Sequence, residues 1–126
     1  MKTKIDTIHA PKAIGPYSQG IAYTASKTLY VSGQTPIDPV TSKIPEFIEE
    51  QTEKCLLNIK AILEEAGSSM DDVMKTTVYL TNMEDFAKMN EIYAKFFKEP
   101  FPARVTVEVS RLPKNVDIEI DAVATF

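Results

Sequence analysis

Cysteine and histidine are almost absent from this chain, and their scarcity excludes two kinds of site. Cys55 is the only cysteine and His9 the only histidine among the 126 residues. A single cysteine cannot form a disulfide within the chain, and it fits a protein that works in the reducing cytosol. One cysteine and one histidine also cannot complete a zinc site within one chain. We therefore expect no zinc site within the chain and a cytoplasmic location.

Long apolar runs and basic patches are missing as well. No segment approaches the ~18 consecutive apolar residues that span a membrane, and the first residues, Met1–Asp6, lack the apolar stretch of a signal peptide. The formal net charge is −4, and the lysines are interleaved with acidic residues. A phosphate backbone attracts clustered positive charge. Neither a membrane nor a nucleic acid is therefore expected as the main partner.

Motifs that bind phosphates or activate a nucleophile are also missing. None of the four glycines belongs to a phosphate loop or a dinucleotide fingerprint. No Cys–His or Ser–His pair can be assembled convincingly, so an activated nucleophile is not expected. The composition, with 44% hydrophobic and 25% charged residues, is that of a globular protein. We predict one domain spanning 1–126.

Hydrophobic periodicity divides the chain into strands and helices. Short segments rich in β-branched residues or with alternating polarity predict strands at 3–9, 20–25, 28–34 and 73–81. A period of 3.6 residues predicts an amphipathic helix over 46–66, which Gly67 ends as the C-terminal cap. Asn82 is expected to cap a second helix, which Pro100 and Pro102 end.

The C-terminal part carries two alternating segments, around Val105–Val109 and Val116–Ala122. Turn-forming residues join them, so the pattern predicts an antiparallel hairpin. Its face away from the core is expected to carry Arg104, Thr106 and several carboxylates within reach of one another, Glu119 among them. The whole order of elements predicts an α+β fold, in which two helices pack on one face of a single mixed, mostly antiparallel sheet with one parallel crossover.

Polar residues that interrupt these patterns are the candidates for a functional site. They are Tyr17, Ser32, Gly33, Asn90, Arg104, Thr106 and Glu119. A fixed cation beside a fixed acid suits a small carboxylate substrate, whereas a solvated, salt-bridged sheet face is the alternative interpretation. Asn90, at the margin of an apolar stripe, could equally bind a neighbouring loop or a ligand. Without a nucleophile, the set fits hydrolysis of a substrate that already reacts with water.

Several of these segments, in this order, resemble the RidA (YjgF) family of imine and enamine deaminases. They are Ala13–Gly20, Ser32–Gln34, Asn90, Phe101–Arg104 with its continuation to Lys114, and Glu119 at the family's spacing. The resemblance covers essentially the whole chain. It implies a chorismate-mutase-like fold assembled as a homotrimer, with ligand sites in clefts between subunits and with neither a cofactor nor a metal.

The resemblance also implies a reaction. Family members hydrolyse 2-aminoacrylate, 2-iminopropanoate or 2-iminobutanoate to a 2-keto acid and ammonia. Dehydratases that use pyridoxal phosphate release these intermediates, and their removal protects other enzymes of that class. The partner implied is therefore a small imino or enamino acid.

The family assigns a role to each candidate residue. Arg104 would bind the substrate carboxylate through a two-pronged bond. Glu119 would orient or deprotonate the attacking water. Hydrogen bonds from Ser32, the Gly33 backbone and Asn90 would hold the water or the ligand. Tyr17 would form a wall of the cleft.

Two positions depart from the family pattern. Thr106 stands where many members have cysteine; its hydroxyl can donate a hydrogen bond into the cleft, but thiol chemistry is lost. Ser42 stands where a turn glycine is common, with an expected effect on a surface turn only.

Two other functions are compatible with the resemblance. A regulator could bind a metabolite in the same cleft without turnover. A ribonuclease or translation inhibitor is disfavoured by the acidic balance and by the lack of a histidine pair.

Overall fold

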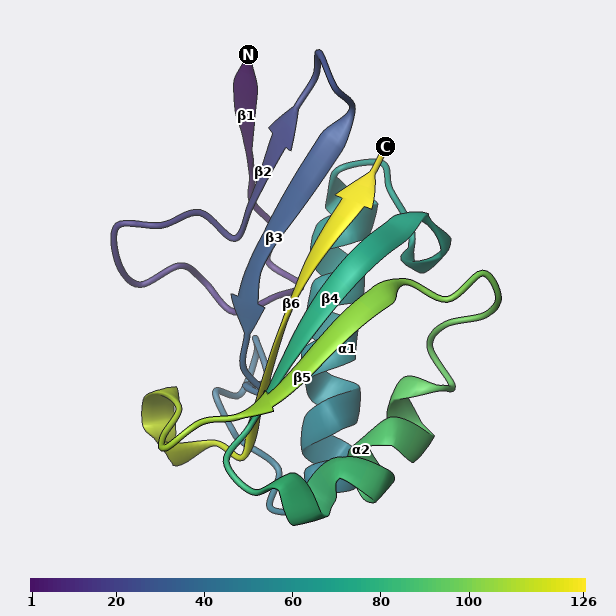
Figure 1. The fold of residues 1–126 in the computed structure, drawn as a ribbon. Helices are drawn as coiled ribbons and strands as arrows, with labels where there is room; N and C mark the ends of the chain where they lie inside the picture. Colours follow the sequence, from purple (N-terminus) through teal and green to yellow (C-terminus); the bar gives the residue numbers. More distant parts are fainter.

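One six-stranded sheet with two helices on one side forms the molecule. The structure, a computed structural model, describes residues 1–126. The strands are β1 (Lys2–Ile5), β2 (Gly20–Tyr23), β3 (Thr28–Gln34), β4 (Val73–Leu80), β5 (Ala103–Glu108) and β6 (Ile118–Thr125), and the helices are α1 (Ile48–Glu65) and α2 (Phe86–Tyr93). Figure 1 shows both helices behind the sheet, whose other face is open. The predicted α+β class is confirmed.

The strands lie in the order β1-β2-β3-β6-β4-β5. Every neighbouring pair is antiparallel except β4 and β5, which run parallel. Strands that point the same way cannot be joined by a tight turn, so the chain crosses over between them through α2. This is the parallel crossover that the order of elements predicts.

The predicted C-terminal hairpin is wrong. β5 and β6 follow each other in the chain, but β4 lies between them and pairs with both. β6 runs through the middle of the sheet, and its side chains Ile118, Ile120, Ala122 and Ala124 are at most 2% exposed. A strand with one wholly apolar face is buried best at the centre, whereas alternation alone says nothing about its neighbours.

The two faces of β5 are the reverse of the prediction. Val105 and Val107 are 45% and 37% exposed, on the open face of the sheet. Arg104 is level with Thr76 of β4, which is 1% exposed, and it points with Thr106 to the helix side. Residues that are level on neighbouring strands share a face. β5 is an edge strand beside the short helix α2, so polar side chains can occupy its inner face.

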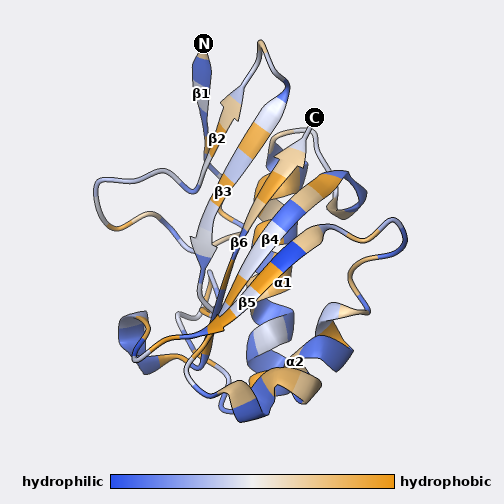
Figure 2. Ribbon diagram, viewed as in Figure 1, coloured by the Kyte–Doolittle hydropathy of each residue, from blue (hydrophilic) through white to orange (hydrophobic).

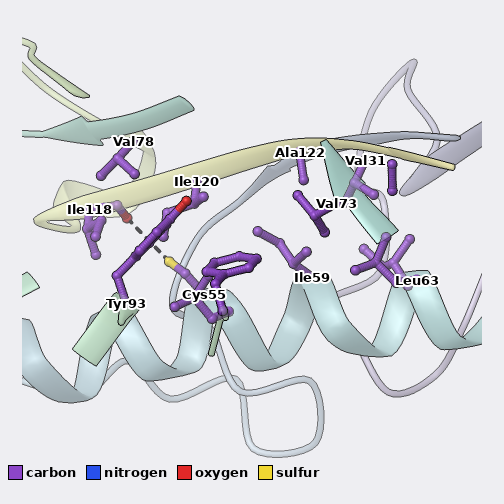
Figure 3. Packing of buried hydrophobic residues seen from close by; sticks show 14 of the residues in the cluster. Val31, Cys55, Ile59, Leu63, Val73, Val78, Tyr93, Ile118, Ile120 and Ala122 are labelled. Carbon is purple, nitrogen blue, oxygen red and sulfur yellow. Dashed lines mark hydrogen bonds between the residues drawn. The ribbon is translucent and has the colours of Figure 1, made fainter. Parts of the chain in front are cut away.

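Helix α1 carries most of the core. It lies within the predicted range, and Gly67 follows it with a φ of +80°, a left-handed conformation that ends a helix. Figure 3 shows Cys55, Ile59 and Leu63 of α1 packed against apolar side chains of the sheet. The buried thiol of Cys55 donates to the carbonyl oxygen of Ile118 at 3.7 Å. Cys55 is therefore a small core residue.

Helix α2 is shorter than predicted. It ends at Tyr93, where the Phe96 N–H donates to the Tyr93 carbonyl at 3.0 Å in the tighter three-residue pattern. Asn82 caps the 3₁₀ turn Met83–Asp85 that precedes the helix, because its side-chain oxygen accepts from the Glu84 N–H at 3.0 Å, whereas α2 itself starts after Asp85 without a side-chain cap. Neither helix of the fold combines the length and the apolarity that a membrane crossing requires.

The open face of the sheet mixes apolar and polar side chains. Figure 2 shows hydrophobic and hydrophilic residues alternating along β3, β4 and β5. Tyr30 of β3 is 55% exposed there, and the two valines of β5 add further apolar surface. Exposed apolar side chains on an uncovered sheet face are available for contact with another molecule.

Candidate functional site

A cavity of about 530 Å³ opens where β3 ends and β6 begins. Its walls come from the loop at 11–17, the connection at 35–42 and the turn at 113–114. Four of the predicted site residues line it, namely Tyr17, Ser32, Gly33 and Glu119. The cavity thus collects residues that lie up to about a hundred positions apart in the sequence.

The loop that forms one wall is held by Gln19, which is 1% exposed. Its amide nitrogen donates to the carbonyls of Thr7, Ala10 and Pro11 at 3.1, 3.2 and 2.7 Å, and its oxygen accepts from the Thr7 N–H at 2.7 Å. One buried side chain therefore provides hydrogen-bond partners for the backbone groups of a loop that has no regular structure. The role of Gln19 was not predicted, because the residue lies in a loop directly before Gly20, where no hydrophobic periodicity indicates which side chains are buried.

Ser32 ties the same loop to the sheet. Its hydroxyl donates to the Ser18 carbonyl at 2.6 Å, and its N–H donates to the Gln19 carbonyl at 2.9 Å. Because the hydroxyl hydrogen is engaged, Ser32 can offer only an acceptor lone pair to a ligand. Tyr17 is 51% exposed at the cavity wall, and its hydroxyl accepts from the Ile14 N–H at 3.4 Å.

Gly33 lets the carboxylate of Glu119 lie directly against the main chain. A β-carbon placed on Gly33 would overlap Glu119 Oε2 and approach its Cδ to 2.9 Å. The ladder between β3 and β6 is irregular at this point, between Val31 and Gln34. Such an irregularity re-aims side chains near the end of a strand. Gly33 is therefore required by the close approach of an acid.

The environment of Glu119 opposes its ionisation. Partial burial raises the pKa of its carboxyl, and the charge of Asp121 adds to the effect. Asp121 itself is held in place, because its two oxygens accept from the Thr77 N–H at 3.1 Å and from the Tyr79 hydroxyl at 3.2 Å. Glu119 thus keeps its proton at a higher pH than an ordinary glutamate does, as acid–base chemistry needs.

A raised pKa has a consequence for stability. A carboxyl whose pKa is raised by folding favours the folded state below its unfolded pKa, and this contribution is lost as the pH rises through the folded value. We expect Glu119→Gln to leave the free energy of unfolding unchanged near pH 4 and to increase it, relative to wild type, at pH 7.5. Denaturant unfolding at both pH values measures the difference.

The exposed Glu53 of α1 provides the matched control. Glu53→Gln removes one carboxyl group from the surface of α1, outside the lining of the cavity, and so reports the effect of the change in net charge alone. A loss of stability in Glu119→Gln at pH 7.5 would contradict the electrostatic argument, because it would mean that the ionised carboxylate has a favourable partner.

Arg104 lies on the other side of the sheet, in a setting made by α2. Its Nη1 donates to Asn90 Oδ1 at 2.7 Å. Its guanidinium carbon lies 4.7 Å from the ring centre of Tyr93 and 5.5 Å from that of Phe86. The position of Asn90 at the margin of the apolar stripe thus has a structural cause: it binds the arginine.

Thr106 adds an unpaired group on the same side. Its hydroxyl oxygen is buried and has no hydrogen-bond partner. A buried hydroxyl without a partner costs about 1–3 kcal/mol, so such a group is expected where a ligand or water completes the bond. It lies two residues after Arg104 on the same face of β5.

The candidate residues thus form two separate groups within one chain. Tyr17, Ser32, Gly33 and Glu119 line the cavity, whereas Asn90, Arg104 and Thr106 lie on the helix side of β5. Glu119 is level with Val107 across β4, on the open face, so it and Arg104 point to opposite faces of the sheet. The expectation that Arg104 and Glu119 share one face is wrong.

The connection at 35–42 holds one feature that was not predicted, the role of Asp38, and one that agrees with the expected turn at Ser42. Asp38 closes the connection at 35–42: its Oδ1 accepts from the N–H groups of Val40 and Thr41 at 2.8 and 2.9 Å. With Lys54 at 3.1 Å, these bonds lower the pKa of Asp38 to about 2. Ser42 in the same connection has a φ of +62°, the region that favours glycine. The Asp-Pro dipeptide predicts a turn, but it does not predict that the Asp38 side chain binds the backbone of this connection.

Metal-binding geometry is absent. No group of three or more histidine, cysteine, aspartate or glutamate side chains is arranged to hold a metal ion. The residues that line the cavity offer an acid with a raised pKa, hydroxyls, a second carboxylate at Asp38 and two lysines, Lys12 and Lys114.

Comparison with known proteins places the chain in a family. The family described as "Endoribonuclease L-PSP" matches residues 7–126. A RutC family protein of Pyrococcus horikoshii is 60% identical over 125 residues, which cover 98% of both chains. A protein of Salmonella typhimurium named 2-iminobutanoate/2-iminopropanoate deaminase is 46% identical over 127 residues, again 98% of each chain.

Solved structures agree with the sequence comparison. The crystal structure of TdcF from Escherichia coli with bound serine superposes with a TM-score of 0.93, is 43% identical, and covers 98% of both chains. The matches extend over the cavity residues and over β5 alike. The chain belongs to the RidA/YjgF family.

Proposed function

We propose that this protein hydrolyses the reactive intermediates 2-aminoacrylate, 2-iminopropanoate and 2-iminobutanoate to 2-keto acids and ammonia. The proposal is carried by two groups that the chain places on opposite faces of the sheet: an acid that resists ionisation, Glu119, and an arginine held by Asn90. The first suits proton transfer, and the second suits a substrate carboxylate. The name of the Salmonella typhimurium relative supports the same substrate class.

The two groups of residues would meet between copies of the chain. Glu119 and Arg104 point to opposite faces of one sheet, so one subunit offers each half of the site on a different surface. The apolar open face, with Tyr30, Val105 and Val107, is the surface on which copies would pack. A homotrimer would then form three clefts, each with the cavity of one copy and Arg104 of its neighbour.

Assembly can be tested on the open face. We expect Val107→Glu to give a folded monomer, because a charge replaces an apolar side chain that packing would bury. Sedimentation velocity at micromolar concentration should show a trimer for wild type and a monomer for the variant. Leu57→Glu is the matched control: Leu57 is 40% exposed, close to the 37% of Val107, but it lies on α1. A wild-type monomer, or dissociation by both variants, would contradict this arrangement.

The reaction follows from these positions. Arg104 fixes the carboxylate of the imino acid, so the imine carbon is presented to water beside Glu119. Ionised Glu119 takes a proton from water as the water oxygen attacks that carbon, and it returns this proton to the nitrogen, which gives a carbinolamine. Glu119 then takes the carbinolamine hydroxyl proton and delivers it to the nitrogen, so that the C–N bond breaks, the carbonyl forms and ammonia leaves. For 2-aminoacrylate, protonation of the methylene carbon first gives the imine.

A coupled assay tests the function. A threonine or serine dehydratase supplies the intermediate, and keto-acid release is followed with and without the protein. We expect release to become several-fold faster, because water positioned beside an acid attacks faster than bulk water does. Release that stays at the rate without the protein, under conditions in which the protein is assembled, would contradict the proposal. Removal of the intermediate would protect enzymes that use pyridoxal phosphate.

One observation favours a second function. The TdcF structure holds serine, an amino acid that also has a carboxylate. A regulator that binds such a metabolite in the cleft without turnover would use the same residues. Serine binding together with no acceleration of keto-acid release would support it. The endoribonuclease of the family description would require salt-sensitive RNA binding, which the net charge of −4 does not favour.

A further inference from the structure

The guanidinium of Arg104 rests on an aromatic surface made by α2. Its carbon lies 4.7 Å from the centre of the Tyr93 ring and 5.5 Å from that of Phe86. Contact with aromatic faces attracts the cation and restricts the tilt of its plane. Of the two rings, Tyr93 is the nearer and is only 6% exposed.

Tyr93 cannot move independently of the sheet. Its hydroxyl lies 2.7 Å from the Thr76 hydroxyl, in a buried hydrogen bond, and its ring packs on Phe97 with a centre-to-centre distance of 4.6 Å. Thr76 lies on β4, level with Arg104 on β5. The ring that supports the arginine is thus tied to the strand beside the arginine. Thr76, Tyr93 and Arg104 thus connect α2 to β4 and β5.

Asn90 fixes the guanidinium in a second direction. It accepts from Nη1 at 2.7 Å, on the same helix as Tyr93. An arginine has five N–H donors in one plane, so one bond to Asn90 leaves a free edge that can bind both oxygens of a carboxylate. Tyr93 sets the plane of the guanidinium, and Asn90 sets its rotation within that plane. The free edge of the guanidinium therefore points in one fixed direction before a ligand binds.

We propose that Tyr93 is a positioning residue that sets the affinity for the substrate carboxylate through Arg104. The proposal rests on the proposed function, in which Arg104 binds that carboxylate. A cation that is already oriented loses little conformational freedom on binding, so its affinity is higher than that of a free side chain. The carboxylate is bound in substrate and transition state alike. Loss of Tyr93 therefore raises KM and leaves kcat nearly constant.

Binding of 2-oxobutanoate, a stable keto acid with the same carboxylate, tests the proposal without turnover. Tyr93→Leu removes the ring, and we expect its Kd, measured by titration calorimetry, to rise about tenfold, within the range of cation–ring contacts. Tyr93→Phe keeps the ring but loses its bond to Thr76, and should raise Kd about threefold. The KM in the coupled assay should follow Kd, with kcat of Tyr93→Leu within about threefold of wild type.

Phe97→Leu is the matched control. It removes an aromatic ring that packs on Tyr93 from the same buried region, 7% exposed, but the ring makes no stacking contact with Arg104. We expect its Kd within twofold of wild type. An equal rise in Kd for Phe97→Leu and Tyr93→Leu would overturn the proposal, since it would show a general loss of packing. No rise for Tyr93→Leu would overturn it as well.

A second variant covers the case in which Tyr93→Leu does not fold. Thr76→Val keeps the ring and its shape but removes the bond that ties the ring to β4. We expect about a threefold rise in Kd, and an unchanged Kd would then overturn the proposal. Failure of the proposed function gives a different result: wild type would not accelerate keto-acid release, whereas the Kd series for 2-oxobutanoate would still report on Tyr93.

Discussion

Replacing Arg104 with alanine is expected to lower kcat/KM for imine hydrolysis by about 100-fold. A two-pronged bond between a guanidinium and a carboxylate is expected to contribute about 3 kcal/mol, which corresponds to that factor. Most of the loss should appear in KM, because the carboxylate takes no part in the bond changes. Initial rates of keto-acid release at increasing intermediate concentration separate the two constants.

Lysine should not restore the activity. Arg104→Lys keeps the charge but offers a point charge in place of a planar fork, and its ammonium cannot both satisfy Asn90 and bind two carboxylate oxygens with the same geometry. We expect a loss of at least tenfold. The chain's only other arginine, Arg111, is exposed, and Arg111→Ala is the matched control, expected within twofold of wild type.

Acceleration that persists in Arg104→Ala would retain the deaminase activity and remove the arginine from its site. The proposed cleft between two copies of the chain would then also lose its main chemical support. Asn90 and Tyr93 would only hold an arginine with a structural role. Binding of 2-oxobutanoate by the variant would distinguish that outcome from a change in the rate-limiting step.

The sequence predicted most elements of the fold because each depends on local periodicity. α1 was predicted within two residues at either end, and the α+β class followed from the order of strands and helices. The neighbours of β6 could not be predicted in the same way. Its pairing with β3 and β4 depends on how the whole sheet is covered by α1, and the turn residues before it only reverse the chain direction.

The error about β5 has a similar cause. Alternation divides a strand into two faces, but it does not say which face the rest of the protein covers. Valines usually face the core, yet Val105 and Val107 are on the open face, and Arg104 faces α2. β5 is an edge strand: one of its faces is covered by α2, which has polar residues at its margin, and the other face is open. The usual rule that valines face the core therefore does not hold for this strand. The family resemblance named Arg104, but only the structure shows what holds it.

The candidate site was predicted by residue type better than by geometry. Ser32 and Gly33 were assigned as ligand contacts, whereas the structure gives each a further role: Ser32 anchors the loop, and Gly33 makes room for Glu119. Gln19 and Tyr93 were not proposed, because a buried amide in a loop and an aromatic residue in a helix stripe look like ordinary packing. Their partners lie on other elements, which no local pattern reveals.

Adding one methyl group at Gly33 is expected to lower kcat by about 100-fold with little loss of stability. The new β-carbon would overlap Glu119 Oε2, and the flexible end of the glutamate would move away in preference to the backbone. A displacement of a reacting group by about 1 Å can cost a factor of this size. The φ of Gly33 lies outside the left-handed region, so alanine adds no backbone strain.

Gly15→Ala is the matched control for this change. A β-carbon at Gly15 meets only the Tyr17 ring, at an ordinary contact distance of 3.6 Å. We expect its kcat within about threefold of wild type, because no reacting group has to move. Thermal unfolding should place both variants within a few degrees of wild type, which separates an effect on the site from an effect on the fold.

The decisive comparison combines Gly33→Ala with Glu119→Gln. If the methyl group acts by moving the carboxylate, it has nothing left to impair once the carboxylate is gone, so the double variant should have the same kcat as Glu119→Gln alone. If each change lowers kcat independently, their effects will multiply, and Gly33 must then act on the substrate or on the assembly. Only the first result assigns the acid–base step to Glu119 and the space it needs to Gly33.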